Sequence, residues 1–188
     1  MNESGLSNLR ILSNSVGTYF HPDPKEKCKL SRVNVNRLTE EVIQSHLMAL
    51  NHKKLNISFL PGLFSFEAIV LMDEHKLRVV LDALLDHAIE HTQAGYVQIG
   101  YLPYDGSLDF FIRDSSNNKS EPVLRPVYVA VNHKACNYKP ARQNYSLKIA
   151  RLFVRLMGGT MKTLIRKGSG SVVTFSVPCL SSEESYSF

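Results

Sequence analysis

The sequence predicts an α/β fold, a two-layer α/β sandwich in which helices cover one face of a mixed sheet. Residues 77–92, LRVVLDALLDHAIEHT, place apolar side chains at the three- and four-residue spacing of a helix with one buried face. Residues 152–161, LFVRLMGGTM, show a second amphipathic pattern, which ends at Gly158-Gly159. Residues 168–178, GSGSVVTFSVP, join a glycine-rich turn to an alternating strand. Long amphipathic helices and strands in one chain indicate a sheet covered by helices.

The first part of the chain predicts a helical segment, a strand and a further helix. Residues 4–20 space their apolar side chains in a moderately helical pattern. Residues 30–35, LSRVNV, alternate as a strand does. Asn36 can cap the next helix, whose apolar face extends to Leu50.

The middle of the chain predicts a long helix between two pairs of strands. Asp73 can cap this helix, which covers residues 74–91. A turn at Pro61-Gly62 joins the two strands before it, and a turn over residues 104–106 joins the two strands after it into a hairpin. The four strands are expected over residues 55–61, 67–72, 96–103 and 107–114.

The last part of the chain predicts a loop, a helix and two strands. Residues 115–142 lack periodicity and are rich in Ser, Asn, Pro and basic side chains, which indicates a loop. A helix follows over residues 143–157, and strands follow over 160–166 and 171–177. The order of elements is compatible with one domain, and the sequence contains no internal repeat.

The composition is that of an ordinary globular protein. Of the 188 residues, 44% are hydrophobic and 21% are charged, as expected for one domain with a core. The chain has no run of eighteen apolar residues, and its first residues lack the basic and apolar regions of a signal peptide. Cys28, Cys136 and Cys179 are odd in number and lack metal-type spacing, which favours reduced thiols. We therefore expect a cytoplasmic protein without a membrane span.

Positive charge is concentrated in one segment of the chain. Residues 119–167 contain eleven Lys and Arg against one acidic residue, Glu121, whereas the whole chain has a net charge of +5. Such a block attracts phosphates, nucleic acid or an acidic partner, or forms a solvated basic surface. Tyr128, Tyr138 and Tyr145 lie among the cations, where bases can stack. The sequence has no nucleic-acid-binding motif, so we do not expect nucleic acid to be the partner.

Together, the long helix, the later amphipathic helix and the final glycine-rich turn and strand resemble the nucleotide-binding domain of two-component sensor histidine kinases, in the GHKL ATPase superfamily. The resemblance covers residues 29–178 and implies a Bergerat-type ATP-binding fold. It divides the chain into an N-terminal segment over 1–28, which would correspond to a remnant of the dimerisation helix, the ATPase-like domain over 29–178, and a disordered tail over 179–188.

The resemblance implies a magnesium-binding asparagine on the long helix, just before an alanine. The aligned segment here places His87 at that position and Ala83 four residues before it. Magnesium prefers hard oxygen ligands, so an imidazole is a poor replacement. Asp82 and Asp86 are the nearby carboxylates that could substitute, although Asp86 points about 100° away from its neighbour around a helix.

The resemblance also implies two glycine pairs, and both are replaced in this chain. The loop pair, which lets the backbone approach the adenine, is Ser116 and Asn118 here. The second pair, which lets a helix N-terminus cradle phosphates, is Asn144 and Ser146. Side chains at these positions would crowd a bound nucleotide.

Two polar residues of the implied nucleotide site are retained. Asp114 ends a strand and matches the aspartate that accepts a hydrogen bond from the adenine amino group, and Ser171 matches a hydroxyl of the adenine-site water network. A basic patch beside them could bind phosphate or a partner. Its members are Lys139, Arg142, Lys148 and Arg151.

His87 and His91 lie four residues apart on one helix face, with Glu90 between them, so a transition-metal site is an alternative use of this helix. The sequence defines no third ligand. Two histidines that line a polar helix face explain the same pattern without a metal, and the metal is left unassigned.

The sequence thus favours a degenerate histidine-kinase ATPase-like domain in two-component or phosphorelay signalling. It would act by protein contact, with weak or no ATP binding and no required cofactor. A receiver domain or a histidine-containing domain would be its partner, and a homodimer is a further expectation. The alternative is an active ATP-binding catalytic domain that uses ATP and Mg²⁺ to phosphorylate a histidine on another segment or partner. A third hypothesis is binding of nucleic acid or an acidic protein through the basic segment.

Overall fold

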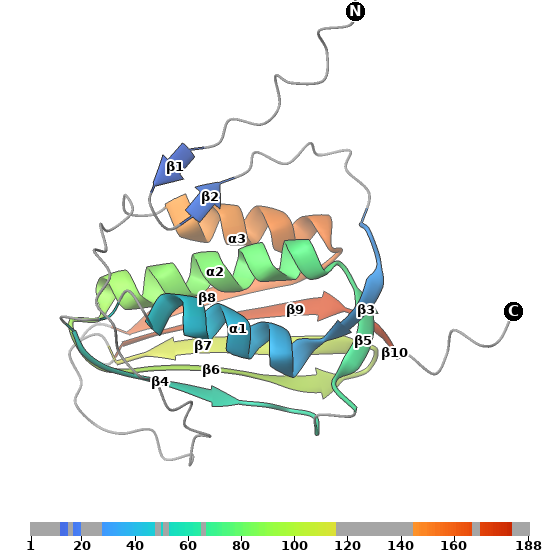
Figure 1. Ribbon diagram of the computed structural model, residues 1–188, viewed down its shortest axis with the longest axis horizontal. Coiled ribbons are helices and arrows are strands. Elements are labelled where there is room, and N and C mark those ends of the chain that lie inside the picture. Colours follow the sequence, from blue (N-terminus) through green and yellow to red (C-terminus); the bar gives the residue numbers. More distant parts are fainter. Residues whose placement is uncertain are drawn as a thin grey trace, which may run out of the picture.

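A five-stranded mixed sheet forms the base of the molecule, and three helices cover one of its faces (Figure 1). The structure is a computed structural model that describes residues 12–14, 17–19, 28–47, 50, 53–64, 67–115, 145–166 and 170–181. The strand order is β4-β6-β7-β9-β8, in which β4 and β6 are parallel and all other neighbours are antiparallel. The strands are β4 (Lys54–Leu60), β6 (Ala94–Tyr104), β7 (Ser107–Asp114), β8 (Thr160–Arg166) and β9 (Gly170–Pro178). The predicted two-layer α/β sandwich is confirmed.

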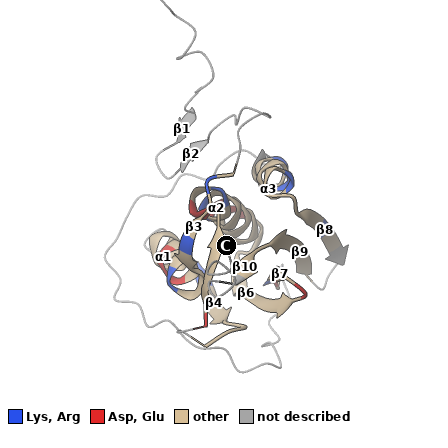
Figure 2. Cartoon of the chain, turned by 90° about the vertical axis from the view of Figure 1, so that its right-hand side faces the viewer, with Lys and Arg blue, Asp and Glu red and all other residues tan. Residues whose placement is uncertain are grey.

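The three helices are α1 (Val35–Leu47), α2 (Glu74–His91) and α3 (Tyr145–Leu156). Figure 2 shows them as one layer along the same side of the curved sheet, with α2 between the other two. The observed bounds of α2 equal the predicted range. The helix begins at Glu74, as predicted, because the Asp73 side chain accepts a hydrogen bond from the backbone N–H of Lys76 at 3.0 Å.

Aromatic side chains from neighbouring strands fill the space between sheet and helices. The rings of Phe110 and Phe175 stack with centroids 4.7 Å apart. Tyr101 is fully buried on β6, and its hydroxyl donates to Oδ1 of Asn36 at 2.5 Å, while Nδ2 of Asn36 donates to the carbonyl oxygen of Leu63 at 3.0 Å. Burial raises the pKa of Tyr101 to about 12. A satisfied polar pair therefore joins α1 to the sheet.

The start of α1 differs from the prediction. Oδ1 of Asn34 accepts from the backbone N–H of Arg37 at 3.0 Å, so Asn34 is the cap and α1 begins at Val35. Asn36 was the predicted cap, but its amide is inside the protein, where Tyr101 and the Leu63 carbonyl use it. A buried partner therefore decides which of two asparagines caps the helix.

A second, smaller sheet lies at one end of the first and has the order β10-β5-β3. Its strands are β3 (Ser31–Asn34), β5 (Ile69–Met72) and β10 (Leu180–Ser181), all antiparallel. The strand predicted over 67–72 therefore pairs with β3 and β10 and belongs to a different sheet from β4. The predicted disordered tail also needs correction at its start, because Leu180 and Ser181 form β10; residues 182–188 lie outside the described residues.

The helical pattern over residues 4–20 does not produce a helix where the structure describes this segment. Two short strands, β1 (Leu12–Asn14) and β2 (Gly17–Tyr19), pair antiparallel instead. In this pairing Ser13 lies opposite Thr18. The predicted loop over 115–142 falls outside the described residues, apart from Ser115.

Candidate functional site

The ends of β7 and β9 bring Asp114 and Ser171 directly opposite each other. Asp114 is only 2% exposed. Its Oδ1 accepts from the backbone N–H of Ser171 at 3.3 Å, and the hydroxyl of Ser171 donates to its Oδ2. The next residue is also fixed, because Ser115 exchanges hydrogen bonds with the backbone of Tyr96 at 3.0 Å in each direction. The carboxylate is therefore held in one orientation at the end of the strand.

Gly170 makes this close approach of the two strands possible. It has φ of +93°, and a Cβ at this position would lie 2.0 Å from the carbonyl oxygen of Asp114. Only glycine combines this backbone conformation with this contact. The glycine-serine turn that the sequence singled out is therefore required by the geometry of the Asp114 site.

His87 lies on the same side of the structure as Asp114, whose charge acts on its ring. The side chain is buried, and its ring packs edge-on against His91 with centroids 4.4 Å apart. Burial and the neighbouring His91 lower the pKa of His87 to about 4, although Asp114 acts in the opposite direction. The imidazole is neutral at pH 7. Ala83, one turn earlier on α2, is buried and adds only a methyl group.

Asp82 and Asp86 face a different helix. Oδ1 of Asp86 lies 3.2 Å from Nε2 of His46 on α1, and Oδ1 of Asp82 lies 3.8 Å from Nδ1 of the same ring. Burial raises the pKa of Asp82, with Asp86 adding to it and His46 opposing it. Both carboxylates were grouped with His87 in the sequence-based pocket, but the structure directs them to the α1–α2 contact. Their location leaves neither in position to replace an oxygen ligand beside His87.

His46 was not identified from the sequence as a member of any site. It is buried on the inner face of α1, and its Nδ1 also lies 2.8 Å from the carbonyl oxygen of Val42. Burial alone would lower its pKa, but Asp86 and the Val42 carbonyl raise it. The sequence did not reveal the role of His46, because a histidine within the apolar face of one helix does not indicate that a carboxylate lies opposite it on another helix.

The remaining predicted residues divide into two groups. Ser146 is buried at the start of α3, and Lys148 and Arg151 are exposed on the same helix. Outside the described residues lie Ser116, Asn118, Lys139, Arg142 and Asn144. The structure therefore gives no geometry for the two glycine-replaced loops, and it keeps the described cations of α3 on the surface.

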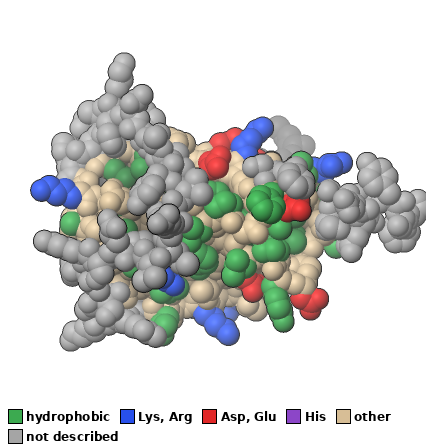
Figure 3. Space-filling model, turned by 90° about the horizontal axis from the view of Figure 1, so that it is seen from below, with side chains coloured by type: hydrophobic (Ala, Val, Ile, Leu, Met, Phe, Trp, Pro, Cys, Tyr) green, Lys and Arg blue, Asp and Glu red, His purple; other side chains and the backbone are tan. Residues whose placement is uncertain are grey.

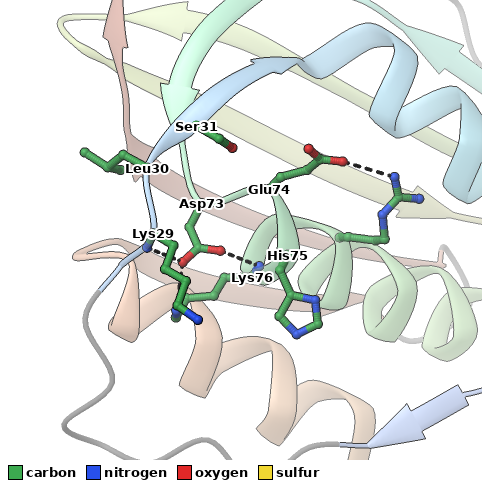
Figure 4. A pocket seen from close by; sticks show the side chains of 8 residues that line it. Lys29, Leu30, Ser31, Asp73, Glu74, His75 and Lys76 are labelled. Atoms are coloured by element: carbon green, nitrogen blue, oxygen red, sulfur yellow. Dashed lines mark hydrogen bonds and ion pairs between the residues drawn. The ribbon is translucent and has the colours of Figure 1, made fainter.

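A hollow of about 440 Å³ lies at the opposite end of α2, beside its N-terminus (Figure 4). Asp73 accepts from the backbone N–H groups of Lys29 and Lys76, and from Nζ of the buried Lys76 at 2.7 Å. Burial alone would raise the pKa of Asp73, but these hydrogen bonds lower it. Glu74 lies 3.4 Å from Arg78. The charges here pair with one another and hold the helix start, and the sequence had identified only the cap.

The part of the chain that the structure describes contains no assembled metal site. Within it, no three His, Cys, Asp or Glu side chains are placed to hold a metal ion, so the pair His87 and His91 gains no third ligand of these types. None of its helices combines the length and apolar character needed to cross a membrane. Cys28 and Cys179 are half-buried thiols, and Sγ of Cys28 donates to the carbonyl oxygen of Leu156 at 3.1 Å, while Cys136 lies outside the described residues.

Comparison with known proteins gives matches in structure alone. No protein-family model matches the chain, and no curated protein matches it in sequence. The histidine kinase AdeS of Acinetobacter baumannii superposes with a TM-score of 0.59 at 17% identity, covering 82% of this chain and 69% of AdeS. The catalytic domain of histidine kinase ThkA in a nucleotide-free form superposes with a TM-score of 0.60 at 19% identity, over 81% of this chain and 99% of that domain.

Full-length ShkA, solved in complex with AMPPNP, superposes with a TM-score of 0.62 at 22% identity. The match covers 85% of this chain but 33% of ShkA, so this chain corresponds to one part of that protein. The sequence resemblance depended on the long helix, the later amphipathic helix and the final glycine-rich turn and strand, and the structure has these as α2, α3 and the start of β9. The chain therefore has the fold of the catalytic domains of histidine kinases.

Proposed function

We propose that this chain is a degenerate histidine-kinase ATPase-like domain that acts by protein contact in two-component or phosphorelay signalling and binds Mg-ATP weakly or not at all. The observation that carries the proposal is the donor set on α2. The position that the resemblance assigns to magnesium is occupied by the buried, neutral imidazole of His87, with Ala83 one turn before it.

This donor set does not suit magnesium, which takes oxygen ligands in a strict octahedral arrangement. An imidazole and a methyl group supply no oxygen. The two α2 carboxylates that the sequence offered as substitutes, Asp82 and Asp86, both lie against His46. Moving Asp86 toward His87 would take the nearer carboxylate away from the buried His46 ring, which is costly. These donors therefore favour a domain that does not depend on magnesium-bound ATP.

The second candidate function, an active ATP-binding catalytic domain, is favoured by one observation. Asp114 and Ser171 are paired, the Asp114 side chain is buried, and Gly170 allows the close approach of the two strands, which is the arrangement expected of an adenine-recognising edge. The adenine base of ATP could bind at this edge, and the affinity for ATP would then depend on Asp114.

The proposed partners are a receiver domain or a histidine-containing domain, and a second copy of this chain is a further candidate. The support for them is the fold alone, since histidine kinases operate with such partners. Lys148 and Arg151, exposed on α3, provide cations for contact with an acidic partner surface or a phosphate.

Calorimetric titration of ATP in the presence of Mg²⁺ tests the proposal. We expect no tight binding to the wild-type chain. Asp114→Ala is the diagnostic variant, and Asp109→Ala is its control because Asp109 is exposed at the other end of the same strand. Tight binding by the wild-type and Asp109→Ala proteins that is lost in Asp114→Ala would replace this proposal with the second candidate.

A further inference from the structure

The five-stranded sheet has a second face, opposite α1–α3, here called the open face. Successive side chains along a strand point to opposite faces of the sheet, and paired residues on neighbouring strands point to the same face. The side chains on the open face therefore form rows that run across the strands. One row consists of Ser58, Gln98, Arg113, Val172 and Leu164. Ser58 and Gln98 are buried, so the accessible part of this row lies over β7, β9 and β8. The next row consists of Leu60, Gly100, Phe111, Thr174 and Lys162.

The open face carries exposed apolar side chains (Figure 3). Leu164 is 54% exposed, Leu102 61% and Tyr104 71%. The Phe111 ring lies over Gly100, since a Cβ on Gly100 would be 2.5 Å from Cζ of Phe111. Large apolar side chains that gather on one surface, in contrast to single scattered ones, are typical of a protein contact.

Two neighbouring hollows shape this surface. One, of about 800 Å³, lies over β7, β8 and β9, and the other, of about 390 Å³, lies beside it toward β6. Lys162 and Thr174 line both, so the two hollows adjoin each other. Arg113 and Lys162 are the charged residues among the described residues that line the larger one, whereas Asp109 lines only the smaller.

We propose that the open face binds an amphipathic helix of a partner protein, with its apolar stripe on Leu102, Phe111 and Leu164 and an acidic flank on Arg113 and Lys162. This contact would be the one through which the degenerate domain acts on its partner, so the inference rests on the proposed function. A helix there would complete a three-layer arrangement with helices on both faces of the sheet.

The dimensions fit a short helix. Leu164 on β8 and Leu102 on β6 are separated by three strand spacings across the sheet, about 14 Å. They are also four residues apart along the strand direction, about 13 Å. The diagonal of about 19 Å equals about thirteen residues of α-helix. A second copy of the same face is disfavoured as the occupant, because it would bring Arg113 and Lys162 against their own like charges.

Binding of a designed probe tests this assignment on the full chain. The probe is a fluorescently labelled amphipathic helical peptide of eighteen residues with a leucine stripe and a glutamate flank, and its twin carries lysine in place of each glutamate. Fluorescence anisotropy should show the acidic peptide binding at least ten-fold more tightly than the twin. The double variant Leu102→Ser/Leu164→Ser should weaken the acidic peptide at least ten-fold, and Lys162→Glu should reverse the preference between the peptides.

Leu180→Ser is the control, because Leu180 is also half-exposed but belongs to β10 in the other sheet. Equal binding of the two peptides, or unchanged binding by the double variant, would overturn the proposal. So would self-association of the wild-type chain in ultracentrifugation that Leu164→Ser abolishes. Titration of ATP with Mg²⁺ on the same protein reports separately on the proposed function, since tight Mg-ATP binding would remove that function and leave the peptide result unaffected.

Discussion

Nε2 of His46 on α1 lies 3.2 Å from Oδ1 of Asp86 on α2, and this pair decides which carboxylates remain available near His87. The ring of His46 is buried and lies also near Asp82 and the Val42 carbonyl oxygen. The pair therefore fixes α1 against α2, and it accounts for the two α2 carboxylates that sequence spacing had grouped with the nucleotide pocket.

The first prediction concerns the pH dependence of this pair. Because the folded pKa of His46 is raised above 6.5, the folded state binds more protons than the unfolded state between those two values. The stabilisation is complete below pH 6.5 and is lost as pH rises through the folded pKa. Urea denaturation at intervals from pH 6 to 9 should show the free energy of unfolding of the wild type falling, and that of His46→Gln changing less. Equal slopes for both proteins would contradict this assignment.

His87 should have the opposite pH dependence. Its folded pKa of about 4 lies below the unfolded value, so the folded state binds fewer protons between pH 4 and 6.5. Stability is complete above pH 6.5 and falls as pH approaches 4, by about 3 kcal/mol. An NMR titration of the imidazole carbon resonances should give a midpoint near 4 for His87. A midpoint near 6.5 would show that the ring is solvated and free to carry a proton.

Gly170→Ala should destabilise the protein by more than about 2 kcal/mol, because the new Cβ meets the Asp114 carbonyl oxygen and the backbone has φ of +93°. Gly106→Ala is the matched control. Gly106 has φ of +68°, but no other atom lies within 4 Å of the place that a Cβ would take, so only conformational strain of about 1 kcal/mol is expected. Urea denaturation of both variants gives the comparison. A smaller loss for Gly170→Ala than for Gly106→Ala would mean that β7 and β9 are not closely packed at Asp114.

Lys76 tests the ion pair at the start of α2. Lys76→Ala leaves the buried Asp73 carboxylate without its cation and should cost about 3–5 kcal/mol. Lys76→Met should cost less, because its side chain fills the buried space that Lys76→Ala leaves empty, while the backbone N–H groups of Lys29 and Lys76 still donate to Asp73 in both variants. Thermal and urea unfolding of the two variants measures the difference. Equal losses of unfolding free energy in the two variants would contradict the expected contribution of the apolar stem. The destabilisation would then come entirely from the missing cation.

Local patterns in the sequence predicted the large elements of the fold. The apolar spacing of α2 and its cap at Asp73, and the hairpin of β6 and β7, all depend on residues close in sequence, and the structure has them where expected. The small sheet was missed because β10 meets β5 across more than one hundred residues, which leaves no periodic signal in either short strand. The cap of α1 was misassigned because the burial of Asn36 depends on Tyr101, far along the chain.

The site was predictable only in part. A strand-end aspartate and a glycine-serine turn stand out in sequence, and the resemblance to known kinases linked Asp114 to Ser171 before the register showed them opposite each other. The direction of Asp86 depends on His46, a residue forty positions earlier on a neighbouring helix. Periodicity gives the angle between side chains on one helix but not the partner that each side chain meets.

The magnesium dependence of ATP affinity is the measurement that bears on the loss of the metal-binding position. ATP dissociation constants should be compared by calorimetry with Mg²⁺ and with EDTA, for the wild type and for Ala83→Asn/His87→Asn, which places amide oxygens at both α2 positions. We predict that the wild-type affinity is weak and changes less than two-fold between the two conditions. If Mg²⁺ tightened the wild-type affinity for ATP ten-fold or more, the proposal that this domain has lost its magnesium site would be contradicted. Oxygen ligands near His87 other than Asp82 and Asp86 would then have to hold the metal.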